Sequence, residues 1–513
     1  MKNQRWKGLA RLLGMVWLGV WLAGCHEDLY VKVESGWLKG VWADDTKGNT
    51  RIFLGIPYAT PPVGDLRFAP PQPAQRWPGL KRAEQFGPSC VQRQGALSAP
   101  GAQSEDCLTL NVYAPAQIPA GGAPVMVFIH GGAFIAGGSS QYNGRRLADT
   151  GNAVVVTLNY RLGALGFFSH PELDGGAVPS GNAGLLDQQL ALRWVKRNIR
   201  AFGGNPKQVT LFGQSAGSAS VCVQMVAPGS RNLVQQFILE SGVCTGGLQF
   251  LSQQQAQGIS SAMAASLCPD AEDRIACLRE LEPLQLMEWG ATNTLFGAGW
   301  APTVIAGSEV LPAPAQELIA AGQYNPGPVM IGTNLNEWGL FQSIGIAPPV
   351  STVAQLSALI DSQFGPAAPA LKAAYLPPVD ALANLALIHL FTDSVFRCPS
   401  RAFARQIQRQ GSPVWLYSFE EGYAFHAMEL PYVFGNPSPV LAPVLVEPLR
   451  ETVQAYWTAF AATGEPTAAN QPFWPPYDEV SDQHMVLKAA SDAGHHLAHP
   501  ACDLWDALLN PAT

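Results

Sequence analysis

Residues 209–225 read VTLFGQSAGSASVCVQM, and this stretch decides the fold. The apolar run 209–212 leads into Gly213-Gln214-Ser215-Ala216-Gly217, and residues 218–225 continue in a pattern compatible with a helix. A serine between small residues, placed between a strand and a helix, is typical of a strained turn in which larger flanking side chains would clash. The helix behind the turn would point its first amide groups at Ser215, where they favour negative charge. We therefore predict that Ser215 occupies a strained turn at the carboxyl end of a buried strand.

Short apolar runs before and after this turn are typical of strands that are buried on both faces of a parallel sheet. They span residues 125–129, 154–158, 209–212, 237–240, 329–332 and 414–419. Apolar residues at helical spacing over 185–199, followed by helix breakers at 203–206, predict a helix between two of these strands. Alternation over 29–42 predicts an antiparallel hairpin, and 110–113 predicts another short strand. The chain is thus predicted to be an α/β protein with a large, mostly parallel central sheet flanked by helices, and with N-terminal antiparallel strands.

The composition indicates a globular chain with a large buried core. Of the 513 residues, 47% are hydrophobic and 13% are charged, and no internal repeat or low-complexity linker divides the chain. We therefore expect one large domain over residues 25–513. The net charge is -7, and beyond the N-terminus no run of Lys or Arg could follow a phosphate backbone. Nucleic acid is accordingly not expected as a partner.

The first residues have the pattern of an export signal. An apolar stretch from Leu12 to Ala23 is too short to span a bilayer comfortably. Basic residues precede it at Lys2, Arg5, Lys7 and Arg11. The stretch ends in Leu22-Ala23-Gly24-Cys25, which resembles the lipobox at which bacterial lipoproteins are cleaved and acylated. We expect residues 1–24 to be a lipoprotein signal peptide and Cys25 to carry the lipid. The alternative is an ordinary secretory signal with a chance cysteine.

Lipidation would hold the exported protein at the bacterial cell envelope, because buried acyl chains anchor a protein without a transmembrane helix. His26, not Asp, follows the cysteine, which favours the outer membrane, with the periplasm as the other location. No other stretch of the sequence is long and apolar enough to span a bilayer, so the anchor is the only membrane contact expected. An oxidising compartment would also favour disulfides among the eight remaining cysteines.

A second glycine-rich loop, His130-Gly131-Gly132-Ala133-Phe134, follows the apolar run 125–129. Hydrolases with the strand-to-helix turn described above place half of an oxyanion hole at this point, where glycines let backbone amides approach a substrate oxygen. We predict that the backbone donors are Gly132, Ala133 and, from the turn, Ala216. The alternative is a tight turn that binds no ligand.

A serine nucleophile also needs a base and a carboxylate that orients the base, and in this fold they follow the serine in the order acid, then histidine. His426 is the best-placed base, because it follows the predicted strand 414–419 on a loop, whereas His389 sits in an apolar run typical of a core helix. Glu337 follows the predicted strand 329–332 and is the candidate acid. An isolated Glu in a loop is most often a solvated surface charge, and only the position of Glu337 relative to the other motifs favours the role of the acid.

Several further motifs resemble the type-B carboxylesterase and cholinesterase family over nearly the whole mature chain. They lie at residues 53–59, 105–111, 159–163, 181–188 and 429–435. The resemblance implies the α/β-hydrolase fold, with Ser215 as nucleophile, His426 as general base and acid, and Glu337 as the carboxylate that orients His426. It implies a small-molecule ester substrate cleaved through an acyl-enzyme intermediate, without metal or cofactor.

The same resemblance implies a pattern of disulfides. The implied pairs are Cys90 with Cys107, Cys268 with Cys277, and Cys398 with Cys502. Cys222 and Cys244 are left over, and we predict that both are buried and free.

Two departures from the family bear on the substrate. Gln214 stands before the serine where the family commonly has Glu, so a negative charge beside the nucleophile is missing. The loop 91–106 contains no aromatic residue, whereas cholinesterases carry there a Trp that binds a quaternary ammonium group. Both departures argue against a choline-ester specialist and favour small to medium neutral esters.

Other functions remain open at this point. A lipase acting on longer-chain glycerides, or an amidase, would use the same residues. A non-catalytic adhesion module of the neuroligin kind shares the fold, but such relatives have lost triad residues that this chain retains. Four aromatic residues are candidates for the lining of the substrate gorge, although each is more often a core residue: Trp300, Trp338, Phe341 and Phe396.

Overall fold

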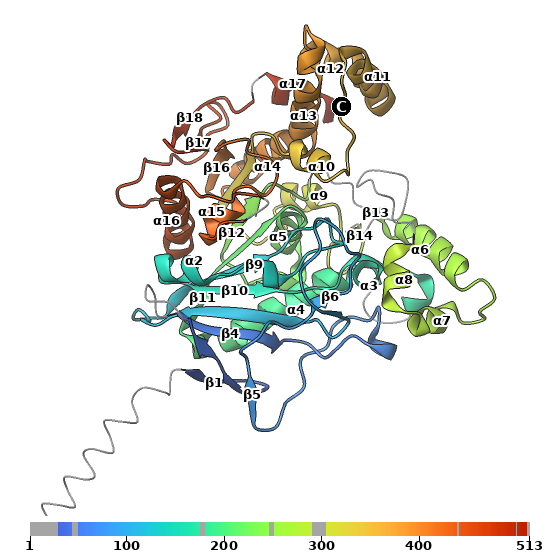
Figure 1. The fold of residues 1–513 in the computed structure, drawn as a ribbon, viewed down its shortest axis with the longest axis vertical. Helices are drawn as coiled ribbons and strands as arrows, with labels where there is room; N and C mark the ends of the chain where they lie inside the picture. The colour runs from blue at the N-terminus through green and yellow to red at the C-terminus, as the bar shows by residue number, and fades with distance from the viewer. Residues whose placement is uncertain are drawn as a thin grey trace, which may run out of the picture.

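The computed structural model describes residues 29–43, 50–174, 180–245, 251–289, 304–438, 441–498 and 500–509. The predicted signal sequence with Cys25 and the aromatic residue Trp300 lie outside the described residues. The centre of the molecule is an 11-stranded sheet with the order β18-β17-β16-β15-β12-β11-β9-β10-β8-β4-β3 (Figure 1). Its strands are β3 (Val41–Trp42), β4 (Thr50–Pro57), β8 (Thr109–Pro115), β9 (Ala123–Ile129), β10 (Val154–Leu158), β11 (Gly204–Gln214), β12 (Gln236–Glu240), β15 (Val329–Asn334), β16 (Val414–Phe419), β17 (His484–Leu487) and β18 (Asp492–Gly494).

The middle of this sheet is parallel and its edges are antiparallel. Strands β10, β9, β11, β12, β15, β16 and β17 run parallel to their neighbours in this order. Strands β8, β4 and β3 on one side and β18 on the other pair antiparallel. Every residue of β9, β10, β12, β15 and β16 is buried, as expected of strands covered on both faces. The α/β fold class predicted from the sequence is confirmed.

Helices cover both faces of the sheet because side chains alternate along each strand. In β9, Val125, Val127 and Ile129 pack with helices α4 and α5, whereas Met126 and Phe128 pack with α2 and α16. The helices are α2 (Arg145–Gly151), α3 (Gly163–Phe167), α4 (Ala183–Asn198), α5 (Ala216–Val226), α6 (Gln253–Leu267), α7 (Arg274–Glu280), α8 (Pro283–Glu288), α9 (Ala315–Ala320), α10 (Trp338–Ser343), α11 (Val353–Phe364), α12 (Ala368–Tyr375), α13 (Ala383–Thr392), α14 (Cys398–Arg409), α15 (Leu430–Phe434), α16 (Glu447–Thr463) and α17 (Ala501–Leu509).

A small sheet of β1 (Tyr30–Val33), β2 (Gly36–Lys39) and β5 (Leu80–Arg82) lies at one end of the molecule (Figure 1). Strands β1 and β2 form the antiparallel hairpin that the alternation over residues 29–42 predicts. In β1, Val31 and Val33 are buried while the residues between them are exposed. The predicted N-terminal antiparallel strands are therefore confirmed.

Helices α11, α12 and α13 gather at the opposite end of the molecule (Figure 1). Helix α13 passes through a π-helical turn, Asp393–Arg397, directly into α14, so this end is connected to the central sheet. Among the described residues, no single helix is long and apolar enough to cross a bilayer, and one bent pair of segments (353–375 and 380–409, bent by 110°) passes that test by length and composition.

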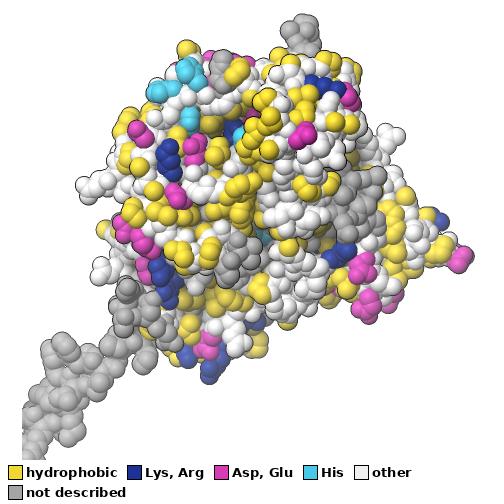
Figure 2. Space-filling view, turned by 45° about the horizontal axis from the view of Figure 1, so that its top comes forward, with side chains coloured by type: hydrophobic (Ala, Val, Ile, Leu, Met, Phe, Trp, Pro, Cys, Tyr) yellow, Lys and Arg dark blue, Asp and Glu magenta, His cyan; other side chains and the backbone are white. Residues whose placement is uncertain are grey.

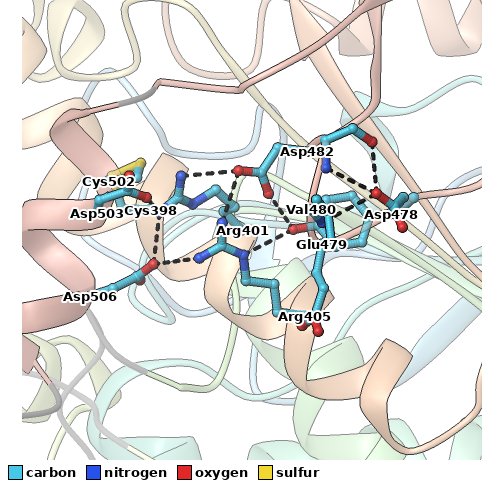
Figure 3. Close-up of polar contacts among 12 residues, drawn as sticks. Cys398, Arg401, Arg405, Asp478, Glu479, Val480, Asp482, Cys502, Asp503 and Asp506 are labelled. Carbon is cyan, nitrogen blue, oxygen red and sulfur yellow. Dashed lines mark hydrogen bonds and ion pairs between the residues drawn. A yellow bond between two sulfur atoms is a disulfide. The ribbon is translucent and has the colours of Figure 1, made fainter. Parts of the chain in front are cut away.

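A buried cluster of charges ties the C-terminal helix α17 to α14 (Figure 3). The side chain of Arg401 is fully buried, and its guanidinium lies 3.2 Å from Asp482, 2.7 Å from Asp503 and 2.7 Å from Asp506. Arg405, one turn further along α14, pairs with Asp482 and Asp506 at 2.8 Å each. A buried guanidinium needs such partners because an unpaired charge in the interior is costly.

Four disulfides join cysteines of the described chain. Three are the pairs that the family resemblance implies: Cys90–Cys107, Cys268–Cys277 and Cys398–Cys502. The fourth joins Cys222 on α5 to Cys244 after β12. The prediction that these two cysteines are buried is confirmed, but the prediction that they are free is wrong. Helix α5 packs against β12, which brings the two Cα atoms to 5.4 Å, a distance typical of a disulfide.

Candidate active site

Ser215 occupies the turn between β11 and α5. Its backbone angles, φ 58° and ψ -124°, lie in a region that non-glycine residues rarely adopt. The neighbouring glycines are required: a Cβ on Gly213 would lie 2.6 Å from the Gly217 carbonyl oxygen, and a Cβ on Gly217 would lie 2.0 Å from that of Ile129. The amide of Ser215 donates a 2.9 Å hydrogen bond to the carbonyl of Glu240. The sequence pattern thus produces the strained strand-to-helix turn that it predicts.

His426 and Glu337 form a buried pair beside this turn. Nδ1 of His426 lies 2.6 Å from Oε2 of Glu337, and the two side chains are 4% and 0% exposed. Glu337 directly precedes α10 after β15, and His426 lies on the loop after β16, so both follow the carboxyl ends of adjacent parallel strands. The backbone amide of Asn334 donates to the other Glu337 oxygen at 2.7 Å. Glu337 is therefore no surface charge, and its carboxylate is held from both sides.

The second ring nitrogen of His426 faces the strand that carries the serine. Its Nε2 lies 3.2 Å from the side-chain amide nitrogen of Gln214, the residue before Ser215. Within the described residues, no hydrogen bond joins the hydroxyl of Ser215 to His426. Such contacts are often long in enzymes without substrate and shorten when substrate binds. The structure thus brings His426 and Glu337 into direct contact. It places Ser215 directly after Gln214, whose side chain contacts His426.

The loop after β9 runs alongside Ser215. A Cβ on Gly131 would lie 3.0 Å from the Ser215 Cβ, so the loop and the serine are in van der Waals contact. Gly132, Ala133 and Phe134 have φ values of 103°, 54° and 59°. Three successive positive φ values are uncommon, because non-glycine residues rarely adopt this region. The site residues predicted for an oxyanion hole, Gly132, Ala133 and Ala216, therefore come from two segments that meet at the serine.

His130 holds this loop in place. Its ring stacks on Tyr160 with centroids 4.5 Å apart, and its Nδ1 donates to the Gly131 carbonyl oxygen at 2.8 Å. Complete burial lowers the pKa of His130 to about 4, so the ring is neutral at neutral pH. The tyrosine hydroxyl in turn donates to the His130 carbonyl at 3.0 Å. His130 is therefore a structural residue of the loop.

Two further buried carboxyl groups lie behind the His426–Glu337 pair, and the sequence reasoning did not identify them. Burial, and secondarily the nearby Glu337, raise the pKa of Glu429 to about 8. Its Oε2 accepts a 2.5 Å hydrogen bond from the Asn334 side chain. Burial also raises the pKa of Glu240 well above its usual range, and Trp457 donates to this carboxyl at 2.7 Å. A Glu three residues after His426, within the motif at 429–435, was the available signal for Glu429.

Aromatic rings surround the imidazole of His426. Phe396 and Phe341 lie 4.9 Å and 5.1 Å from it, centroid to centroid. Trp338 belongs to the same buried cluster but stacks on Phe391 at 4.4 Å. Of the four candidates for the gorge lining, two therefore touch the histidine, one packs behind them, and Trp300 lies outside the described residues.

The described residues contain no group of three His, Cys, Asp or Glu side chains that could hold a metal ion. On the face in Figure 2, Lys and Arg side chains stand in small groups among Asp and Glu, without a continuous basic stripe.

Comparison with known proteins agrees with the geometry. The model of the carboxylesterase family matches residues 27–505. Human carboxylesterase 3 is 34% identical, with 90% of this chain and 88% of the relative covered. The para-nitrobenzyl esterase of Bacillus subtilis (strain 168) is 35% identical, with coverages of 89% and 94%. The fumonisin B1 esterase of Sphingopyxis macrogoltabida is 34% identical, with coverages of 87% and 84%. The chain therefore belongs to the carboxylesterase family of carboxylic ester hydrolases.

Proposed function

We propose that this enzyme hydrolyses carboxylic esters with Ser215 as nucleophile, His426 as general base and acid, and Glu337 as the carboxylate that orients the histidine. The observation that carries the proposal is the buried 2.6 Å contact between His426 and Glu337 beside a serine in a strained strand-to-helix turn. A buried carboxylate on Nδ1 holds the neutral ring in the tautomer whose Nε2 can take a proton.

The reaction proceeds in two halves. The Ser215 oxygen attacks the ester carbonyl carbon while Nε2 of His426 takes the hydroxyl proton. The resulting oxyanion accepts hydrogen bonds from the amides of Gly132, Ala133 and Ala216, and it collapses as His426 gives its proton to the leaving alcohol. Water then attacks the acyl-serine with the same histidine as base, which releases the acid and restores the serine.

The surroundings of His426 favour small to medium neutral esters as substrates. The rings of Phe341 and Phe396 make the site apolar on the side of the imidazole. Gln214 carries no charge, and the loop 91–106 supplies no aromatic ring for a quaternary ammonium group. The names of the relatives, which include a para-nitrobenzyl esterase and mammalian carboxylesterases, agree with this class of substrate.

The test is hydrolysis of p-nitrophenyl butyrate by the full chain and by its Ser215→Ala variant. We expect activity in the parent and none above background in the variant. A series of nitrophenyl esters of increasing acyl length separates the alternatives, because a lipase would prefer the long chains. A folded parent without activity on any ester would favour the non-catalytic adhesion module.

We further propose that residues 1–24 are a lipoprotein signal peptide and that the mature protein is anchored at the bacterial cell envelope, in the outer membrane, through a lipid on Cys25. The basic and apolar segments before the cysteine support this, and four disulfides suit an oxidising compartment. Membrane fractionation of cells that express the parent and the Cys25→Ser variant tests it. An equal distribution of both proteins between membrane and soluble fractions would contradict lipidation.

A further inference from the structure

Gln214 touches the ring nitrogen of His426 that the proposed reaction uses. As the last residue of β11 it is 3% exposed, and its amide nitrogen lies 3.2 Å from Nε2. On the other side of the same side chain, its Oε1 lies close to Gly131 of the glycine-rich loop: a Cβ placed on Gly131 would be 3.2 Å from it. The amide therefore lies between the imidazole and the loop that runs beside Ser215.

The protonation of the ring fixes the direction of this contact. Nδ1 is 2.6 Å from a carboxylate oxygen of Glu337 and therefore carries a proton. In the neutral ring Nε2 then has a lone pair and can only accept. Gln214 has N–H groups to donate to it, whereas an ionised Glu at this position has none. The contact thus matches the neutral ring, which is the form that a general base needs.

We propose that Gln214 is a positioning residue: its side-chain amide holds the neutral imidazole of His426 against Glu337 in the resting enzyme and gives up Nε2 to the Ser215 hydroxyl when an ester binds. The inference rests on the proposed function of the same site. A contact of the amide with Nε2 also keeps the ring in the tautomer with its proton on Nδ1.

The titratable groups around His426 explain why an uncharged residue at position 214 matters. Glu337 faces the ring directly, and Glu429 lies behind it through Asn334. Glu240 on β12 lies opposite Gln214 in the strand register. On the turn that carries Phe396, Arg397 and Asp393 neutralise each other in a 2.7 Å ion pair. A carboxylate at position 214 would therefore be a further acidic group in a region that already contains three.

The test compares Gln214→Glu and Gln214→Met with the full-length parent, using steady-state hydrolysis of p-nitrophenyl butyrate from about pH 5 to about pH 9. In Gln214→Glu, the carboxylate can accept a hydrogen bond from the protonated imidazole but cannot donate one to the neutral imidazole. The substitution therefore favours the protonated form of His426. We expect the acid limb of the kcat/KM profile to move up by about one pH unit. Gln214→Met fills the same space without a hydrogen bond, and we expect kcat to fall about fivefold with little change in KM.

Gln224→Met is a matched control. Gln224 is equally buried on α5, but its amide binds Leu185 and Gln188 instead of the histidine. This variant is expected to lose stability and to keep the pH profile of the parent. Circular dichroism establishes that each variant is folded.

The variants separate the role of Gln214 from ester hydrolysis itself. If Gln214→Glu keeps both the kcat and the acid limb of an active parent, the positioning role of Gln214 is overturned while ester hydrolysis stands. If Gln214→Met fails to fold, Gln214→Glu alone decides the question. If the parent is inactive, or Ser215→Ala is as active as the parent, the proposed function itself is wrong.

Discussion

Glu337 holds Nδ1 of His426 at 2.6 Å inside the protein, where neither side chain is in appreciable contact with solvent. Replacing the carboxylate by an amide in Glu337→Gln keeps the shape but can stabilise the tautomer with its proton on the wrong nitrogen. We expect kcat to fall about 10⁴-fold with a small change in KM. Steady-state kinetics checks this, with the exposed Glu317→Gln as control. A loss of less than tenfold would remove Glu337 from the triad.

The loop beside the serine leaves no room for a side chain at its centre. Gly132 has φ 103°, and a Cβ there would lie 2.1 Å from the Ala136 carbonyl oxygen, so Gly132→Ala must displace the amides of the loop. We expect kcat to fall by about 10² or more, because the oxyanion loses a preorganised donor. Gly101→Ala is the matched control, with φ 91° and no atom within 4 Å of the added Cβ. Full activity in Gly132→Ala would show that the loop takes no part in the reaction.

The disulfide Cys222–Cys244 joins α5, the helix that begins at the nucleophile, to the loop after β12. The loop after β12 that carries Cys244 packs on the turn, since a Cβ on Gly242 would be 2.6 Å from the Ser215 carbonyl oxygen and Ser218 donates to Gly242 at 2.5 Å. We expect the Cys222→Ala/Cys244→Ala variant to lose about 3 kcal/mol of unfolding free energy. We also expect a several-fold loss of kcat, because the turn loosens.

The control for this effect is Cys268→Ala/Cys277→Ala. That disulfide joins the end of α6 to α7, away from the serine. Chemical denaturation should show a loss of stability in this variant as well, and ester hydrolysis should stay at the level of the parent. Equal activity in both double variants would mean that the Cys222–Cys244 bond contributes to stability alone.

Glu429 makes the stability of the fold depend on pH. Burial and the neighbouring Glu337 raise its pKa from 4.5 to about 8, so between these values the folded chain holds a proton that the unfolded chain has released. Stability from this group is therefore lost as the pH rises through that window. Glu429→Gln stays neutral at every pH, and we expect its Tm to fall less than that of the parent between about pH 6 and about pH 9. Parallel Tm curves for the two proteins would contradict the assignment.

The fold could be predicted from the sequence because its signals are local. The strand-to-helix turn at Ser215 and the helix predicted at 185–199 correspond to residues that are neighbours in the chain, and α4 spans Ala183–Asn198. Strand β11 begins earlier than predicted, at Gly204, because its first residues pair with Ala123 across a register shift. Tertiary pairing of this kind leaves no trace in the hydrophobic pattern.

The parts of the site that could not be predicted depend on contacts between distant segments. Gln214 and His426 are 212 positions apart, and their contact follows from the order of strands β11, β12, β15 and β16. The family resemblance implies partners for six cysteines and none for Cys222 and Cys244. Their bond depends on the packing of α5 against β12, which joins segments 22 positions apart. A protonated carboxyl such as Glu429 depends on burial, which the sequence does not display.

The partners of Arg401 have a consequence for the synthesis of the protein. Asp503 and Asp506 belong to α17, so they are synthesised about a hundred residues after the arginine that they neutralise. A chain that stops before α17 would leave a buried guanidinium with Asp482 as its remaining partner from this cluster, a defect of about 3–5 kcal/mol. A truncation before α17 would thus destabilise the fold about as much as a large cavity in the core, and we expect cellular proteases to degrade the truncated product.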